Sequence, residues 1–207
     1  MSGIRQIALV GNPNCGKTSL FNQLTGARQK VANYAGVTVE RKEGRLALPS
    51  GRTLRILDLP GAYSLDAASP DEAVTRAVCL GELPGEQAPD LIVCVADATN
   101  LRLHLRFVLE VKRLGRPMVL ALNMMDSARR RDIRIDVAEL SARLGMPVIE
   151  TVAVRRDGVA DLLAQLDKPL LAPVPDASEA GADLHAEVNA LLAATVVMPT
   201  LTDSRDD

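Results

Sequence analysis

The chain has 207 residues, of which 47% are hydrophobic and 24% are charged, and its formal net charge is −2. This length suits one domain with a tail, and the near-neutral charge argues against a nucleic-acid-binding protein. The three cysteines form no pattern typical of a zinc site or a disulfide framework, which favours a reducing cytoplasm.

The N-terminal part of the chain predicts a strand, a glycine-rich loop, a helix and then a hairpin. The apolar run at 4–10 (IRQIALV) predicts the strand, and KTSLFNQLTG at 17–26 predicts the helix after the loop. A polar segment around 28–38 separates this helix from two further runs, at 39–49 and 53–60, which a Pro-Ser-Gly turn joins. Such a turn between two strand-like runs predicts a β-hairpin.

From residue 69 onward, predicted helices and strands alternate. Ser69 and Pro70 are typical of a helix start, and Asp136 with Glu139 forms the pattern of a capping box. Helices are expected at 71–82, 100–115, 136–145 and 158–166, and strands at 91–98, 117–123 and 147–154. This order predicts an α/β fold with a mostly parallel, six-stranded sheet and helices on both faces. In such folds, ligands bind at the carboxyl ends of the strands.

The end of the chain differs in composition from the rest. Residues 168–182 are rich in Pro and Ala and break the periodicity, so a first domain is expected at 1–167. Residues 183–197 predict one helix, and 168–207 is therefore expected to form a linker and a short C-terminal helical appendage. No apolar run approaches the roughly 18–20 residues that span a bilayer, so this chain, as given, is expected to be soluble.

The octapeptide GNPNCGKT at 11–18 follows the first strand and opens the first helix, which is the context of a P-loop. Its backbone NH groups and the helix N-terminus would surround phosphates, Lys17 would reach the β and γ phosphates, and Thr18 would bind Mg²⁺. A glycine turn beside a surface lysine is the alternative. The residues expected to contact nucleotide here are Gly11, Asn12, Pro13, Asn14, Cys15, Gly16, Lys17, Thr18 and Ser19.

Two further motifs follow later strands. DLPG at 58–61 provides a carboxylate, Asp58, that can hold the hydration shell of Mg²⁺, and a glycine, Gly61, whose NH can sense a γ phosphate. NMMD at 123–126 ends in Asp126, whose carboxylate can accept hydrogen bonds from N1 and N2 of guanine, whereas adenine offers no such pair of donors. These motifs favour GTP over ATP; a helix N-cap is the alternative role of Asp126.

In this order the three motifs resemble those of P-loop GTPases, which implies the P-loop GTPase fold. Together with NYAGVTVERKEG at 33–44, they resemble more closely the cytoplasmic, N-terminal GTPase domain of the FeoB ferrous iron transporter family, over residues 4–167. The resemblance implies that Thr38 coordinates Mg²⁺ in the GTP state and that Gly36 and Val37 lie beside the nucleotide. It assigns recognition of the base to Asn123, Met124, Asp126, Ala153 and Val154.

The chain departs from the general GTPase pattern at three of these places. Met124 stands where many GTPases have a lysine, which predicts modest nucleotide affinity and quick exchange. Ala153 stands where the family often has a serine, so only its backbone NH is expected to act. Ala62 replaces the glutamine that orients the attacking water in small GTPases, which predicts slow intrinsic hydrolysis.

A cation could supply the missing stabilisation of charge in the transition state. The amide oxygen of Asn14 is expected on the phosphate side of the loop, and the resemblance to potassium-activated GTPases, FeoB among them, implies that Asn14 binds K⁺. Stabilisation of the loop by hydrogen bonds from its side chain to the backbone is the alternative. Catalysis of GTP hydrolysis to GDP and phosphate is thus expected to involve Asn14, Lys17, Thr38 and Gly61.

The resemblance implies a GTPase switch domain that regulates ferrous iron transport at the cytoplasmic face of the bacterial inner membrane. Its expected partner is a membrane permease part of the same polypeptide, with possible self-association. This chain is then expected to be a fragment, and a shortened natural variant is the alternative. No nucleic-acid partner and no direct iron site are expected. The alternatives are a soluble RNA- or ribosome-associated GTPase, for which the acidic, alanine-rich tail supplies no RNA-binding module, and a P-loop kinase or ATPase, which NMMD disfavours.

Overall fold

A seven-stranded sheet forms the centre of the structure. The computed structural model describes residues 5–169 and 183–199. The strand order is β2-β3-β4-β1-β5-β6-β8; β1 pairs in parallel with β4 and β5, as do β5 with β6 and β6 with β8, whereas β2–β3 and β3–β4 are antiparallel. The strands are β1 (Gln6–Gly11), β2 (Gln29–Asn33), β3 (Glu40–Ala47), β4 (Thr53–Asp58), β5 (Leu91–Asp97), β6 (Met118–Asn123) and β8 (Val148–Glu150).

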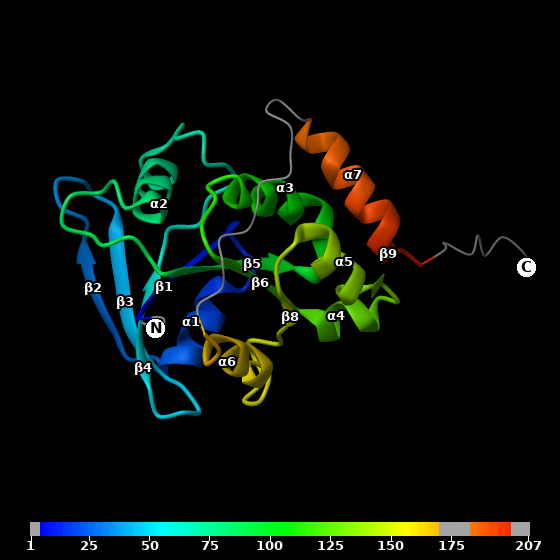
Figure 1. The fold of residues 1–207 in the computed structure, drawn as a ribbon, viewed down its shortest axis with the longest axis horizontal. Helices are drawn as coiled ribbons and strands as arrows, with labels where there is room; N and C mark the ends of the chain where they lie inside the picture. The colour runs from blue at the N-terminus through cyan, green and yellow to red at the C-terminus, as the bar shows by residue number, and fades with distance from the viewer. Residues whose placement is uncertain (1–4, 170–182, 200–207) are drawn as a thin grey trace, which may run out of the picture.

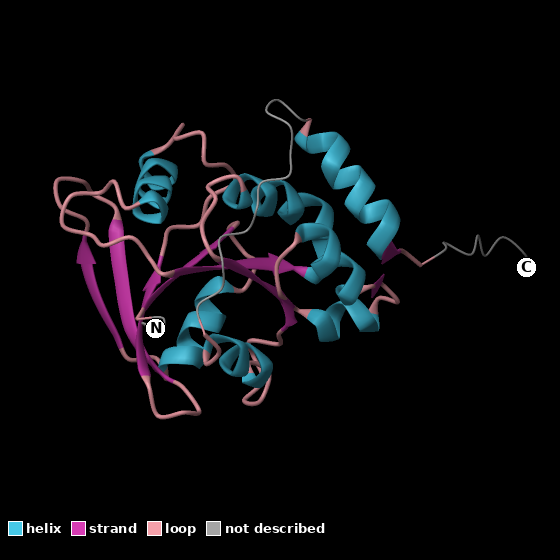
Figure 2. Cartoon of the chain, in the orientation of Figure 1, coloured by secondary structure: helices cyan, strands magenta, loops and turns pink. Residues whose placement is uncertain are grey.

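Helices cover both faces of this sheet, as Figure 1 and Figure 2 show. The helices are α1 (Lys17–Thr25), α2 (Pro70–Leu80), α3 (Leu101–Lys112), α4 (Met125–Arg130), α5 (Val137–Leu144), α6 (Ala160–Leu166) and α7 (Leu184–Thr195), with a 3₁₀ turn η1 (Ala98–Asn100). Helices α1 and α6 lie on one face, and α2, α3 and α5 lie on the other. The predicted α/β fold is confirmed.

Alternation along β1 shows how the sequence divides the core. Ile7 and Leu9 pack into the cluster under α1 and α6, whereas Ala8 and Val10 pack into the cluster under α2, α3 and α5. All four side chains are fully buried. Successive side chains of a strand point to opposite faces, so a central strand covered on both faces must be apolar throughout.

The predicted count of six strands is wrong, because β2 also joins the sheet. This edge strand lies in the segment at 28–38 that the sequence pattern describes only as polar, and all five of its residues are exposed. A strand without a buried face shows no alternation of apolar and polar residues. Two short strands that the pattern does not predict, β7 (Arg134–Ile135) and β9 (Val196–Val197), pair with each other in a separate sheet.

The predicted hairpin and helix starts are confirmed. β3 and β4 pair in antiparallel register, with Leu46 opposite Leu54. At the start of α2, the Ser69 side chain accepts a hydrogen bond from the Glu72 backbone NH, while the Glu72 side chain accepts one from the Ser69 NH. At the start of α5, Asp136 accepts from the Glu139 NH at 2.9 Å.

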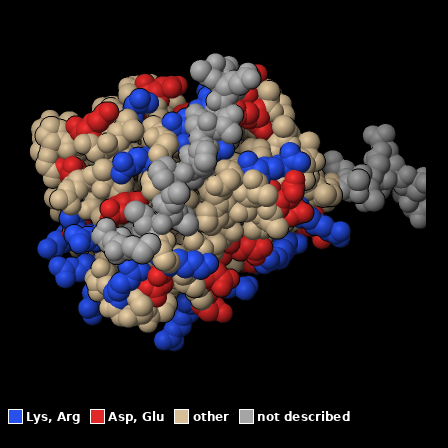
Figure 3. All heavy atoms as spheres, viewed as in Figure 1, with Lys and Arg blue, Asp and Glu red and all other residues tan. Residues whose placement is uncertain are grey.

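The last helix packs on the outside of the second helical layer. α7 contacts α3 and α5, and its Val188 and Leu191 belong to the same core cluster as the buried faces of those helices. Within 5–169 and 183–199, no helix is long and apolar enough to cross a membrane. Figure 3 shows Lys and Arg side chains interspersed with Asp and Glu on the visible face. The expected boundary at 167/168 stays a prediction.

Candidate functional site

The loop between β1 and α1 has the backbone shape of a phosphate-binding turn. Asn14 and Gly16 both lie in the left-handed region, with φ of 65° and 86°. At Gly16 a side chain is excluded for two reasons: the left-handed conformation disfavours it, and a Cβ there would collide with Nδ2 of Asn123. Asn is among the few residues with a side chain that adopt this conformation readily. The turn therefore favours the residue types that the sequence places at both positions.

Lys17, the first residue of α1, lies at the base of this loop and is 9% exposed. Its ammonium group contacts a carboxylate oxygen of Asp58 and donates to the Leu59 carbonyl at 2.6 Å. Asp58 is the last residue of β4, the strand that pairs with β1, and it is 5% exposed. The fold thus brings the P-loop lysine and the DLPG carboxylate into direct contact.

A cavity of about 360 Å³ opens above this pair. Its polar lining and its position at the carboxyl ends of β1 and β4 match the expected site for phosphates. It brings together most residues of the predicted P-loop set and one residue of DLPG. The lining residues are Asn12, Pro13, Asn14, Gly16, Lys17, Thr18, Ser19 and Gly61.

Asn123 joins three loops at the end of β6. Its Nδ2 donates to the Cys15 carbonyl at 3.1 Å, which ties it to the P-loop. Its Oδ1 accepts from the Thr151 hydroxyl at 3.2 Å and from the Ala153 NH at 3.0 Å, which ties it to the loop after β8. The side chain is buried, with 2% of the residue exposed. The predicted base-recognition residue is also a structural junction.

Asp126 lies nearby in the first turn of α4. Arg130 donates to its carboxylate at 3.0 Å, and an Arg155 nitrogen lies 3.9 Å from the same oxygen. Burial opposes ionisation of Asp126, but the Ser127 backbone NH, Arg130 and Arg155 together hold the pKa of this carboxyl below its usual value. Asp126 is therefore an anion, as an acceptor for two donors on a base must be.

The remaining residues of the base-binding set differ in burial. Met124 has φ of 61°, and its methyl group lies near the Cα of Gly16, where an added Cβ would be 3.4 Å away. Ala153 is buried and uses its NH to bond Asn123, whereas Val154 is 81% exposed. The methyl end of the Met124 side chain therefore lies close to the P-loop.

The segment that carries Thr38 lies apart from the cavity. Gly36, Val37 and Thr38 are exposed, and none of them lines the cavity beside Lys17. Their neighbours anchor the loop: the Tyr34 NH donates to the Val39 carbonyl at 3.0 Å, and both residues are buried. Coordination of Mg²⁺ by Thr38 remains a prediction that depends on movement of this exposed turn.

The chain after Asp58 approaches the P-loop through its backbone. The Ala62 NH donates to the Gly11 carbonyl at 3.1 Å, and a Cβ at Gly61 would lie 3.2 Å from the Pro13 ring. Ala62 is 2% exposed, with its methyl group in the core. Tyr63 follows it and is 55% exposed. The side chain at 62 therefore faces away from solvent and offers no polar group to a water molecule.

Two residues of this site carry no signal in the sequence motifs. Thr151 contacts Asn123 only because β8 lies beside β6 in the sheet, and Arg155 approaches Asp126 across the loop after β8. Cys15 lies inside the motif, but burial raises the pKa of its thiol to about 11. The thiol is fully buried and packs in the core cluster under α1.

Comparisons with known proteins agree with this geometry. Residues 5–166 match the family model described as ferrous iron transport protein B. The chain is 49% identical over 154 residues to the Fe(2+) transporter FeoB of Salmonella typhimurium and 48% identical to that of Escherichia coli K12. These matches cover 74% of the chain but only 20% of each relative.

Solved structures of FeoB cytosolic domains resemble the fold of this chain. The cytosolic domain of L. pneumophila FeoB superimposes with a TM-score of 0.78 at 30% identity, covering 93% of this chain and 99% of that one. The T. maritima FeoB cytosolic domain in its GMPPNP form gives 0.74 at 38%, covering 85% and 69%. A GDP-bound variant of the S. thermophilus FeoB G-domain gives 0.71 at 40%, covering 84% and 66%.

Proposed function

The chain belongs to the ferrous iron transport protein B family, and on this premise we propose that it is a GTP-binding and GTP-hydrolysing domain that regulates ferrous iron transport. The transporting part would be a membrane permease in the same polypeptide, since the chain spans 20% of the length of the FeoB relatives. In this proposal the domain acts at the cytoplasmic face of the bacterial inner membrane. Its GTP-bound and GDP-bound states would bias the permease differently.

One observation carries this proposal: the cavity that the P-loop, Lys17 and Gly61 line together. Asn14 and Gly16 are left-handed, and a turn with such residues is a backbone shape in which successive NH groups can form a concave surface for phosphate oxygens. The N-terminus of α1 adds positive potential at the same place. The GDP and GMPPNP forms of the S. thermophilus and T. maritima structures support the same reading.

The oxygen donors beside Lys17 fit Mg²⁺. Asp58 presents a buried carboxylate, and Thr18 presents a hydroxyl at the start of α1 on the wall of the cavity. Mg²⁺ prefers such hard oxygen ligands and keeps several waters, so Asp58 would hold it through its hydration shell and Thr18 directly. When bound, Mg²⁺ would neutralise charge on the β and γ phosphates. Thr38 would join this set when GTP orders the exposed turn.

The residues of the chain itself would position GTP and stabilise its charge. Lys17 supplies a cation at the base of the cavity, and Gly61 lines the same cavity. Asp126 would select guanine, because its carboxylate can accept hydrogen bonds from N1 and N2 of guanine and adenine offers no such pair of donors. Since Ala62 has no polar side chain, the attacking water would be held by backbone groups, and intrinsic hydrolysis should be slow.

Asn14 fits a K⁺ ligand in this site. It lines the cavity, and its amide makes no hydrogen bond with any residue in the described ranges. The structure therefore gives no support to the alternative that the Asn14 side chain stabilises the loop through a hydrogen bond. Its φ of 65° is a second reason for an asparagine at this position.

One substitution separates the two reasons for an asparagine at position 14, the amide that could bind K⁺ and the left-handed backbone. Asn14→Gly preserves the left-handed backbone but removes the amide, so the loop should keep its shape and its affinity for GDP. Phosphate release from GTP is measured in K⁺ and in Na⁺ at equal ionic strength. We expect the wild-type chain to be faster in K⁺ by about tenfold or more, and Asn14→Gly to lose this difference. Equal wild-type rates, or a K⁺ response retained in Asn14→Gly, would contradict the cation site; ATP hydrolysis as fast as that of GTP would contradict the GTPase.

A further inference from the structure

The chain between β4 and α2 is anchored to the P-loop side of the fold at its beginning. The Leu59 NH donates to the Leu9 carbonyl at 3.1 Å, and the Ala62 NH donates to the Gly11 carbonyl at 3.1 Å. No helix or strand forms between Leu59 and Ser69. The position of this segment therefore depends on individual contacts.

Its middle is held by one side chain from α3, Glu110. The Leu65 NH donates to Oε2 of Glu110 at 2.8 Å, and the Ser64 hydroxyl donates to the same oxygen at 3.0 Å. The Glu110 side chain is only 10% exposed. Hydrogen bonds to a charged, largely buried acceptor are stronger than those between neutral groups. Glu110 thus joins a helix of the core to the loop that begins at DLPG.

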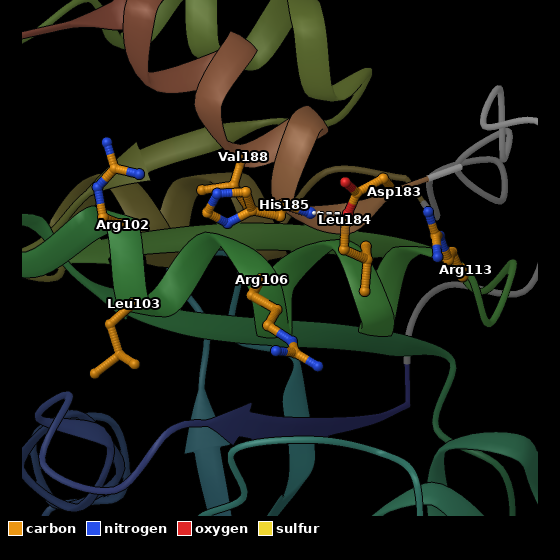
Figure 4. A pocket seen from close by; sticks show the side chains of 8 residues that line it. All are labelled: Arg102, Leu103, Arg106, Arg113, Asp183, Leu184, His185 and Val188. Atoms are coloured by element: carbon orange, nitrogen blue, oxygen red, sulfur yellow. Dashed lines mark hydrogen bonds between the residues drawn. The ribbon is translucent and has the colours of Figure 1, made fainter. Parts of the chain in front are cut away.

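The other contacts of Glu110 are weaker. Its Oε1 faces Nε of Arg106 at 3.4 Å, but Arg106 is one helical turn away and 64% exposed. In Figure 4, Arg106 points away from α7, whereas Arg102 rises beside that helix, along a groove of about 570 Å³ between α3 and α7. An ion pair such as Arg106–Glu110, whose arginine is exposed, contributes little to stability. The two donors from the loop are therefore the main partners of Glu110.

Helix α3 is a rigid support for this contact. Leu105, Phe107, Val108 and Val111 of this helix are buried in the core cluster over the sheet. The loop is thus fixed at Ala62 on one side and at Ser64 on the other, and only Tyr63 lies between them. A chain held at two points so close together has few conformations left.

We propose that Glu110 is a positioning residue for GTP hydrolysis, which rests on the proposed function of this site. By holding Ser64 and Leu65, it keeps the backbone of Gly61 and Ala62 against the P-loop, where a γ phosphate and its attacking water would lie. The contact matters here because Ala62 has no polar side chain to orient water, so placement of the backbone must do so. Binding of nucleotide depends on the P-loop and on the loop of Asp126, which Glu110 does not touch.

Three variants test this proposal. Glu110→Ala removes the accepting oxygen; Glu110→Gln preserves one carbonyl oxygen, which can accept both bonds because both use Oε2. Arg106→Ala is the matched control on the same helix. The readouts are the single-turnover rate of GTP hydrolysis, the affinity for a non-hydrolysable GTP analogue, and amide hydrogen exchange at Leu65 in the nucleotide-free chain.

We expect Glu110→Ala to lower the hydrolysis rate about tenfold, which corresponds to roughly 1.4 kcal/mol, with analogue affinity within about twofold. Exchange at Leu65 should become faster in the same variant. Glu110→Gln should recover most of the rate, and Arg106→Ala should match the wild-type chain. Such a split between rate and affinity is not expected of a residue that only stabilises the fold.

Other results would overturn the proposal in distinguishable ways. If the wild-type chain hydrolyses GTP and Glu110→Ala does so equally fast, or if exchange at Leu65 is unchanged, Glu110 does not position the loop. Equal losses in rate and affinity, together with a lower Tm, would show that it acts on stability alone. A wild-type chain that binds GTP without hydrolysing it would remove the proposed function and this role together.

Discussion

Replacement of Asn123 by Ala tests whether this residue is a structural junction as well as a contact for the base. The change removes one donor to the Cys15 carbonyl and one acceptor shared by Thr151 and the Ala153 NH. All three partners lie in the interior around a residue that is 2% exposed. The Thr151 hydroxyl can rotate toward another acceptor, but the Cys15 carbonyl and the Ala153 NH cannot. These two backbone groups therefore determine the loss of stability.

The magnitude follows from those two backbone groups. Each buried group that loses its partner costs about 1–3 kcal/mol, so Asn123→Ala should lower the free energy of unfolding by about 4 kcal/mol. For a chain of this size, 1 kcal/mol shifts Tm by roughly 2–4 °C, which predicts a fall of roughly 8–16 °C. The measurement is thermal unfolding of the nucleotide-free chain by far-UV circular dichroism.

Two further variants make this result specific. Asn100→Ala is the matched control, because Asn100 is exposed before α3 and makes no capping hydrogen bond; its effect should stay within about 0.5 kcal/mol. Asn123→Asp preserves the acceptor for Ala153 but places an oxygen opposite the Cys15 carbonyl, so it should also destabilise. A Tm for Asn123→Ala within about 2 °C of the wild-type value would refute the junction, even if GDP binding were lost.

Two other predictions concern titration. The Arg55 hydrogen bond is the largest cause that lowers the pKa of Glu43, from 4.5 to about 2; since the folded value lies below the unfolded one, this stabilisation is present above pH 4.5 and is lost as pH falls toward about 2. Glu43→Gln should flatten that part of a plot of unfolding free energy against pH, and an unchanged slope would contradict the pairing. Burial raises the thiol pKa of Cys15 to about 11, that of Cys79 to about 12 and that of Cys94 well above its usual value. A thiol reagent at about pH 8 should therefore label the chain only after urea is added, and rapid labelling without urea would refute this burial.

Much of the site could be predicted because its motifs are local. A P-loop, DLPG and NMMD each follow a strand directly, and parallel strands place their carboxyl ends at one edge of a sheet. The contact between Lys17 and Asp58 follows from the pairing of β1 with β4. For this part, the position of each motif directly after a strand was the information that the prediction used.

The contacts made across elements could not be predicted in the same way. Thr151 reaches Asn123 only through the adjacency of β6 and β8, and Glu110 reaches Leu65 from the last turn of α3. In the sequence, Glu110 is one of several charged residues in an amphipathic pattern, and nothing local distinguishes it from Arg106. Strand β2 was missed for a different reason, since a strand exposed on every residue has no apolar period to detect.

The two tyrosines have a practical consequence for spectroscopy. The chain contains no tryptophan, and its two tyrosines are Tyr34, which is buried, and Tyr63, which is 55% exposed. Tyr34 lies four residues before Thr38 and Tyr63 two residues after Gly61, so all tyrosine emission of the protein originates in the two loops expected to respond to nucleotide. A soluble quencher such as iodide reaches Tyr63 and not Tyr34. The unlabelled protein therefore carries its own optical reporters, one for each loop, with distinguishable signals.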